Sequence, residues 1–465
     1  MKKLIKIISL MLAFILAASA LVACANKPTG ENPTPAPVAD PTAKPADPTA
    51  DPADPTQAPD NGTAKVLGIR PANGSGAEPS GEIEKAYINA SNAFAATLVN
   101  AMGENWTGVV SPVSFGMLLE MLANGASDED SVAILKAMLI EMGLEASNEN
   151  VARLIAAIMK PAESSNAANT PSKVSLNSAI LVSEGDSFTK SFETAIADHF
   201  NASVGSIDFT DESKALETIN GWVNENTNGL VPKLFDHIPG DTTMALINAL
   251  YFNANWRTPF IAFKGDPDTR GDEINMFHGI SGDQPVSMLT ATAEYACGDF
   301  DGDQVVLVPY ADGAYYMAVI LPADGKTASA AFADTVSKFS ECVNTPAYVA
   351  MPAIELSTNF DAMPILKTLG LGSVAEGNIQ FPNIVDGSDI RLTQFVHAAT
   401  IRVTETGTEA GAASGATGTK TAFQEPAFRL VCDRPYAMAI VHAETGTVLF
   451  VSTVNELPTP VEDVR

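Results

Sequence analysis

The chain has 465 residues, of which 46% are hydrophobic and 18% charged, so it is long enough to bury a sizeable core in one large domain or two smaller ones. Asp and Glu number 55 against 27 Lys and Arg, which gives a net charge of -28. This balance argues against nucleic acid and anionic membrane surfaces as partners.

The N-terminus predicts export. Residues 1–23 begin with basic side chains and continue as an apolar stretch that ends in small residues before Cys24, which is the pattern of a signal peptide. Leu21–Cys24 resembles the lipobox of bacterial lipoproteins, in which the Cys becomes the lipidated first residue after cleavage. We therefore expect a cell-surface lipoprotein that contacts the membrane only through its lipid anchor. A plain secretory signal, which would give an extracellular protein, and an uncleaved anchor are the alternatives.

The next segment, residues 24–80, predicts a disordered stalk. It repeats Pro, Ala, Thr and Asp with few residues that could be buried, and such a composition cannot support a core. Its many prolines favour an extended spacer at about 3 Å per residue. The folded domain is expected at 81–458, followed by a short tail at 459–465.

Three stretches in the first half of this domain predict helices. Apolar residues recur on one face from Glu82 to Leu98, and a capping signal at Ser127 precedes another apolar pattern. Residues 213–226 show the same period and stop at Asn228.

Later the pattern changes to strands. Residues 304–310 and 314–322 are apolar runs on either side of a turn, and 435–442 and 447–454 form a second such pair. Helices and strands mix without regular alternation, which predicts an α+β fold in a single domain.

The sequence contains no recognisable catalytic or metal site. It has five His, but it contains neither the Gly-x-Ser-x-Gly motif of a nucleophile elbow nor a His-containing zinc motif. Asp299–Asp303 faintly resembles a calcium loop but lacks the required offsets, so a turn is expected there. After Cys24, the thiols of Cys297, Cys342 and Cys432 are expected to be free and buried. We predict a protein that is not an enzyme and needs no cofactor or metal.

The strangest stretch is 404–426, most of which is Gly, Ala, Ser and Thr. A flexible linker is the ordinary interpretation of such a run. However, it is entered from a strand pattern at Phe395–Val403, and the strands that follow it are too few to form a second domain. It must therefore loop out of one compact body.

This stretch also carries a family resemblance. Glu405–Ser414, ETGTEAGAAS, resembles the loop hinge of inhibitory serpins, whose usual form is E-x-G-T-E-A-A-A-A-T. Further matches in the same order are Ser111–Ser114, Ile219–Val223, Thr227–Gly229, Leu246–Phe252, Trp256, Pro259–Phe260, Met351–Pro352, Leu369–Gly370 and Arg434–Phe450.

The resemblance implies the serpin fold, with three β-sheets, eight or nine helices and an exposed reactive-centre loop at about 405–428. It also implies a monomer whose partner is a target serine protease. The protease attacks the loop and forms an acyl-enzyme, and the cut loop then inserts into the main sheet and traps the protease.

Family positions carried over to this chain define three groups of site residues. The loop hinge comprises Glu405, Gly407, Thr408, Glu409, Ala410, Ala412, Ala413 and Ser414. A polar cluster beneath the sheet opening comprises Ser111, Ser114, Asn248 and His397, and Trp256 is the aromatic residue at the top of the sheet. In an inserted strand alternate side chains are buried, and those expected on that face (Thr408, Ala410, Ala412, Ser414, Ala416 and Gly418) are all small and uncharged. The extra glycines of the loop are expected to slow insertion and so to favour turnover as a substrate.

The usual spacing from the hinge puts the scissile bond at Thr421–Ala422, where a small residue suits an elastase-like protease. Lys420 would instead suit a trypsin-like enzyme, and the cut could also shift towards Phe423. Subtilisin-like or cysteine proteases are further alternatives. Two other functions remain open: a non-inhibitory binding module with the serpin fold, and a solute-binding lipoprotein or enzyme.

Overall fold

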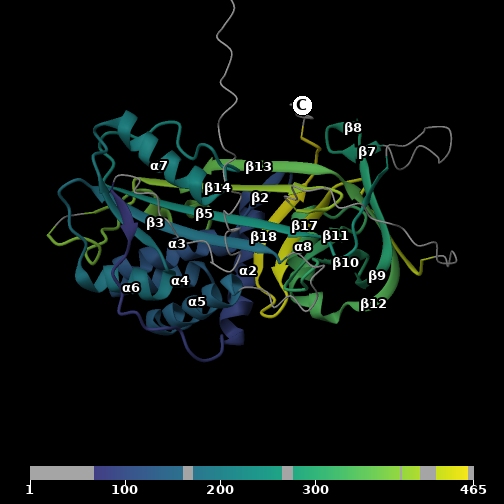
Figure 1. The fold of residues 1–465 in the computed structure, drawn as a ribbon, viewed down its shortest axis with the longest axis horizontal. Coiled ribbons are helices and arrows are strands. Elements are labelled where there is room, and N and C mark those ends of the chain that lie inside the picture. The colour runs from purple at the N-terminus through teal and green to yellow at the C-terminus, as the bar shows by residue number, and fades with distance from the viewer. Residues whose placement is uncertain (1–67, 161–170, 264–275, 388–389, 409–425, 459–465) are drawn as a thin grey trace, which may run out of the picture. The chain divides into compact units, whose positions relative to one another are not determined.

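The computed structural model describes residues 68–160, 171–263, 276–387, 390–408 and 426–458 (Figure 1). The predicted signal peptide, Cys24, most of the stalk, most of the reactive-centre loop and the C-terminal tail lie outside the described residues.

Nine α-helices and one 3-10 helix occur in the described part of the chain. They are α2 (Lys85–Met102), α3 (Pro112–Gly125), α4 (Asp128–Ala137), α5 (Leu144–Met159), α6 (Lys190–Phe200), α7 (Glu212–Asn226), α8 (Ala328–Thr335), η2 (Val336–Glu341), α9 (Met363–Thr368) and α10 (Gly372–Ala375).

The main sheet has seven strands. Their order is β1 (Ile69–Pro71), β4 (Ser203–Ile207), β3 (Lys173–Ser183), β5 (Met244–Asn255), β15 (Gly407–Thr408), β14 (Gln394–Val403) and β13 (Ile354–Asp361).

A nine-stranded sheet and a two-stranded sheet complete the fold. The path of the larger one is β16 (Phe428–Val431), β12 (Val343–Pro352), β9 (Met288–Phe300), β10 (Asp303–Pro309), β11 (Tyr315–Leu321), β17 (Tyr436–His442), β18 (Val448–Val454) and β2 (Gly108–Val110), and β6 (Ile261–Phe263) pairs with β9 at its side. The small sheet pairs β7 (Met276–Gly279) with β8 (Gly282–Pro285).

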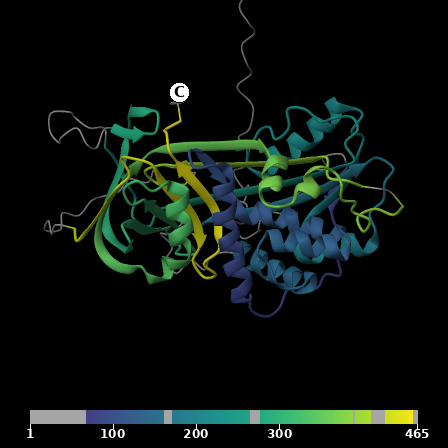
Figure 2. The same ribbon diagram turned by 180° about the vertical axis from the view of Figure 1, so that it is seen from behind.

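The two faces of the seven-stranded sheet are covered differently. One face packs with α3 and its neighbouring helices into the main core, while α7 covers the other face through Ile219, Trp222 and Val223 (Figures 1 and 2). Helix α3 is buried along almost its whole length, as expected of a helix that is apolar on every side. It therefore forms the floor beneath the centre of this sheet.

The predicted α+β fold is confirmed, and so are its local elements. The helical patterns become α2, α4 and α7, and Ser127 Oγ accepts a hydrogen bond from Asp130 N at 3.2 Å as the cap of α4. Both predicted hairpins form, as β10–β11 and β17–β18. The expected turn joins β9 to β10, where Asp299 Oδ1 accepts from Gly302 N at 2.9 Å. Cys297 and Cys432 are buried free thiols, and Cys342 is free but only half-buried.

The folded body begins earlier than the predicted boundary at residue 81. Ile69–Pro71 pair antiparallel with Ser203–Gly205 as the edge strand β1, and Ala72 N donates to Ala202 O at 3.2 Å. Composition predicted a stalk here because these residues offer little to bury. The strand is held by backbone hydrogen bonds, which composition does not reveal.

The carboxylate of Glu193 on α6 forms hydrogen bonds to this N-terminal segment. Its Oε1 accepts hydrogen bonds from Arg70 Nη1 at 2.5 Å, Asn73 N at 3.0 Å and Asn73 Nδ2 at 2.8 Å. We expect Glu193→Ala to lose about 1 kcal/mol of stability and to speed amide hydrogen exchange across residues 69–75. Glu217→Ala, at an exposed position on α7, is the control and should leave that exchange unchanged. Equal exchange in both variants would show that Glu193 does not hold the segment.

Candidate functional site

The described part of the predicted loop hinge, which ends at Thr408, enters the main sheet between two of its central strands. After β14 the chain turns, with Thr404 N donating to Gly407 O at 2.9 Å. Gly407 and Thr408 then run antiparallel to both neighbours: Thr408 pairs with Ala254 of β5 on one side and with Val403 of β14 on the other. The first two residues of an added strand are thus already part of the sheet.

Thr408 is buried, with 2% of its surface exposed. Its hydroxyl shares a 2.7 Å hydrogen bond with the hydroxyl of Tyr310. Burial raises the pKa of Tyr310 far above its usual range, so this phenol keeps its proton at any physiological pH. Only a small side chain that can share this hydrogen bond fits here.

Gly407 fits for a steric reason. A Cβ at this position would lie 2.1 Å from Ala254 O and 2.8 Å from Asn255 Cα. Both contacts are with backbone of the neighbouring strand, so no side-chain movement could relieve them.

Trp256 binds the turn that leads into the hinge through two hydrogen bonds. Its backbone N–H donates to Thr406 O at 2.8 Å, and its indole Nε1–H donates to Thr404 O at 2.9 Å. The indole stacks on Tyr310, with ring centroids 4.5 Å apart and planes 11° apart. Phe260 N also donates to Glu405 O at 2.8 Å. The same two aromatic residues, Trp256 and Tyr310, therefore position both the turn and Thr408.

Strands β5 and β14 keep one register throughout this region. Away from the hinge they pair directly, with Phe395 level with Leu246. Eight residues further along each strand, Val403 and Ala254 lie level with each other on either side of Thr408. β5 and β14 are thus parallel strands that pair directly near Leu246 and Phe395. Near Ala254 and Val403 they lie on either side of Thr408.

Three of the four predicted polar residues meet beneath this opening. His397 Nε2 accepts from Ser111 N at 3.1 Å, and Ser111 Oγ bonds to Ser114 Oγ at 2.9 Å. Ser111 is also the N-cap of α3, because its Oγ accepts from Ser114 N. The imidazole lies between the rings of Phe115 and Phe360, each with its centroid 5.7 Å away. This network joins the start of α3 to the underside of β14.

Asn248 is also buried, but its side-chain hydrogen bond leads elsewhere. Its Nδ2 donates to Ser178 Oγ on β3 at 2.7 Å. The predicted single cluster is therefore two networks, one under β14 and one bridging β5 to β3. Sequence reasoning missed both Ser178 and Tyr310. Ser178 lies in β3 and Tyr310 follows β10, where it forms an isolated bridge with Trp256, and no local pattern marks the partner of either residue.

Burial lowers the pKa of His397 to about 4. The unfolded imidazole titrates near 6.5, so the neutral native form contributes stability that is complete above pH 6.5 and is lost as the pH falls towards 4. We expect the full-length protein to lose roughly 2 to 3 kcal/mol more stability between pH 7 and pH 4.5 than His397→Gln does. Urea unfolding at the two pH values measures this difference. Equal losses in the two proteins would mean that His397 is not the group responsible.

Beyond the loop the chain returns to the nine-stranded sheet. Phe428–Val431 form β16, which pairs parallel with β12, and the Arg429 guanidinium lies 4.4 Å from the centroid of the Tyr348 ring. Both ends of the loop are thus fixed in sheets. Glu409 to Ser414, the bond Thr421–Ala422 and Lys420 lie outside the described residues.

The described residues form no group of three or more His, Cys, Asp and Glu that could bind a metal ion. No helix in the described ranges is long and apolar enough to cross a membrane.

Comparison with known proteins identifies the family of this chain. A family model described as Serpin (serine protease inhibitor) matches residues 89–457. Serpin-ZX of Arabidopsis thaliana is 26% identical over 387 residues, which cover 77% of this chain and 94% of the relative. A serine protease inhibitor of Rattus norvegicus is 26% identical over 357 residues, which cover 75% of this chain and 83% of the relative.

Among solved structures, the thermophilic serpin tengpin in its native state matches with a TM-score of 0.70 at 23% identity, covering 83% of this chain and 97% of that chain. The chain therefore belongs to the serpin family. Members of this family are generally protease inhibitors and not catalysts.

Proposed function

We propose that this serpin inhibits serine proteases as a suicide substrate while held at the cell surface by a lipid on Cys24 and the Pro-rich stalk. The observation that carries the proposal is the start of the hinge, in which Gly407 and Thr408 already pair with β5 and Thr408 also pairs with β14. A loop that starts inside the sheet has a defined direction in which to continue.

The shared register supports continued insertion. If the strand extends from Thr408, position 410 comes level with Phe252 and Ile401, and position 412 with Leu250 and Ala399. Position 414 comes level with Asn248 and His397. The residues at these positions are Ala410, Ala412 and Ser414, so two small apolar side chains would face apolar neighbours and the Ser would meet the two polar networks. No shift of β5 against β14 is required.

The protease carries out the covalent steps of this mechanism. Its catalytic serine attacks the carbonyl carbon of Thr421, and the bond to Ala422 breaks with release of the new amine. The loop remains attached as an ester while the freed strand enters the sheet. If the strand inserts before water hydrolyses the ester, the protease is trapped. If insertion is slower than hydrolysis, the products are a cleaved inhibitor and a free protease.

Thr421 favours an elastase-like target, because a small residue suits a small specificity pocket. The test incubates the full-length protein with elastase and, in parallel, with trypsin. We expect an SDS-resistant complex with elastase at near-equimolar ratio, and mass spectrometry of the released peptide should show that it begins at Ala422. A complex with trypsin and a peptide beginning at Thr421 would move the target to the trypsin-like class. Clean cleavage by both enzymes without any complex would overturn inhibition and leave a non-inhibitory serpin.

The tether is tested separately. Cells that express the protein with labelled palmitate should incorporate label into the wild type and not into Cys24→Ser, and the variant should appear in the medium. Unlabelled wild type would overturn the lipid anchor without affecting inhibition.

A further inference from the structure

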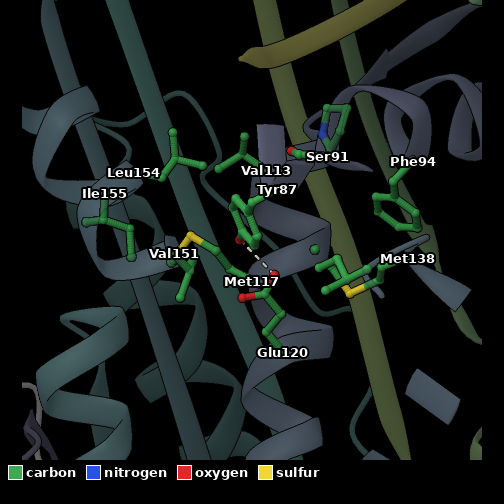
Figure 3. Close-up of a pocket in the computed structure, with 13 residues that line it drawn as sticks. Tyr87, Ser91, Phe94, Val113, Met117, Glu120, Met138, Val151, Leu154 and Ile155 are labelled. Carbon is green, nitrogen blue, oxygen red and sulfur yellow. Dashed lines mark hydrogen bonds between the residues drawn. The ribbon is translucent and has the colours of Figure 1, made fainter. Parts of the chain in front are cut away.

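A small cavity lies within the helical layer, away from the hinge. It is enclosed by α2, α3, α5 and the segment after α4, and its volume is about 20 Å³ (Figure 3). This is room for about one water molecule. Phe94, Met117, Met138 and Leu154 give it a largely apolar wall.

One carboxyl group stands in this apolar setting. Glu120 of α3 is 1% exposed, and its Oε1 accepts a hydrogen bond from the hydroxyl of Tyr87 at 2.8 Å (Figure 3). Its second oxygen, Oε2, is buried and has no hydrogen-bond partner among the described residues. The Ser147 hydroxyl on α5 is also buried; it lies near enough to this carboxyl group to lower its pKa slightly, but the two groups do not reach hydrogen-bond geometry.

Within the described ranges, no positive charge lines the cavity around the carboxyl group. The surrounding elements present Tyr87 from α2, apolar residues from α5 (Val151, Leu154 and Ile155), and Met138 and Ile140 from the segment after α4. The basic residues of these helices, Lys85, Lys136 and Arg153, do not line the cavity. Tyr87 and Glu120 are the titratable residues among those that do.

An isolated buried carboxylate is costly, and binding a proton removes the charge. We propose that Glu120 is a proton-binding site of the native fold, a neutral carboxylic acid at neutral pH whose ionisation at alkaline pH weakens the packing of α3. Burial raises the pKa of Glu120 to about 8, against smaller opposite effects of the Tyr87 hydrogen bond and the Ser147 hydroxyl.

The position of Glu120 on α3 means that its protonation state affects the main sheet as well as the cavity. Helix α3 is capped by Ser111, whose N–H donates to His397, and it packs against β5. A charge on Glu120 thus acts on the floor beneath the two strands that hold the hinge. The inference concerns the stability of the native fold and does not depend on protease inhibition.

The pH range of the effect follows from the two states. The unfolded carboxyl titrates near 4.3, so from there to pH 8 the native state binds one proton that the unfolded state lacks. Stability therefore falls as the pH rises through this range and levels off above it. Below pH 6.5 the buried His397 changes stability in the opposite sense, since its pKa is lowered. The range from pH 6.5 to 8 therefore isolates Glu120 best.

The experiment compares urea unfolding of the full-length protein and Glu120→Gln between pH 6 and pH 9.5. From pH 6.5 to 8, the unfolding constant of the wild type should rise relative to that of the variant by up to tenfold per pH unit, and the ratio should then become constant. A ratio independent of pH overturns the proposal.

Tyr87→Phe separates a proton switch from simple packing. It removes the hydrogen bond that lowers the pKa of Glu120, so the pH-dependent range should extend further above 8. A purely structural role predicts the same loss at every pH.

Glu120→Gln could fail to fold, so the wild type is also measured directly by carbon-13 NMR of labelled Glu carboxyl groups. We expect one carboxyl signal that titrates near pH 8 and is absent from Glu120→Asp, which has no labelled Glu at position 120 and so assigns the signal. Titration of every Glu below pH 6 overturns the proposal.

Discussion

If the protein inhibits proteases as proposed, Thr408→Arg is expected to convert it into a substrate that the target protease cleaves and releases. Thr408 is the second residue of β15, and 2% of it is exposed. An Arg there would place an unpaired charge against the Tyr310 hydroxyl, at a cost of several kcal/mol. A barrier raised by about 3 kcal/mol slows insertion more than a hundredfold, and hydrolysis of the acyl-enzyme then comes first.

The measurement is the yield of SDS-resistant complex at fixed ratios of inhibitor to protease. Glu409→Arg is the matched control, because it introduces the same side chain one residue later, where strand alternation points it to the other face. It should retain most of the complex. Wild-type yield from Thr408→Arg would mean that the hinge need not enter the sheet.

Gly407→Ala is expected to expel the hinge from the native sheet. The added methyl group would lie 2.1 Å from Ala254 O, so Gly407 and Thr408 must move away from β5. Trp256 then loses both of its hydrogen bonds to the turn, and Tyr310 loses its bond to Thr408. Together these changes should lower the stability of the native protein by about 2 to 3 kcal/mol.

Tryptophan fluorescence and thermal unfolding measure this change. The chain has three Trp, and Trp256 is the one that donates to the hinge turn, so a red shift of the emission would report its exposure. Gly221→Ala adds the same methyl group on α7 where nothing lies within 4 Å, and it should leave the spectrum unchanged. An unchanged spectrum in Gly407→Ala would show that β5 yields to the methyl group.

Sequence patterns predicted the elements whose signal is local. The alternation of Phe395, His397, Ala399, Ile401 and Val403 is the buried side of β14. The helical period of α7 places Ile219, Trp222 and Val223 on the sheet. Such periods depend only on neighbouring residues, because each element has one face in the core.

The contacts that complete the site depend on distant residues. Thr408 meets Tyr310 at a separation of 98 residues, and Asn248 meets Ser178 at a separation of 70. The order of β3 and β5 brings Asn248 to Ser178, and the bridge between Trp256 and Tyr310 brings Tyr310 to the hinge; no local period specifies either arrangement. The edge strand β1 escaped prediction for a different reason, since backbone pairing needs no particular side chain.

The arrangement of β5 and β14 on either side of Thr408 bears on the rate of loop insertion. Forming the first pairs of a new strand is the slow part of its growth, since chain ends must be brought together before any contact offsets the lost entropy. Here those first pairs exist before any protease arrives, with Thr408 between Ala254 and Val403. For a loop that enters between β5 and β14, insertion then extends a strand whose first residues, Gly407 and Thr408, are already in place. The native fold thus already contains the first pairs of the strand that insertion would complete.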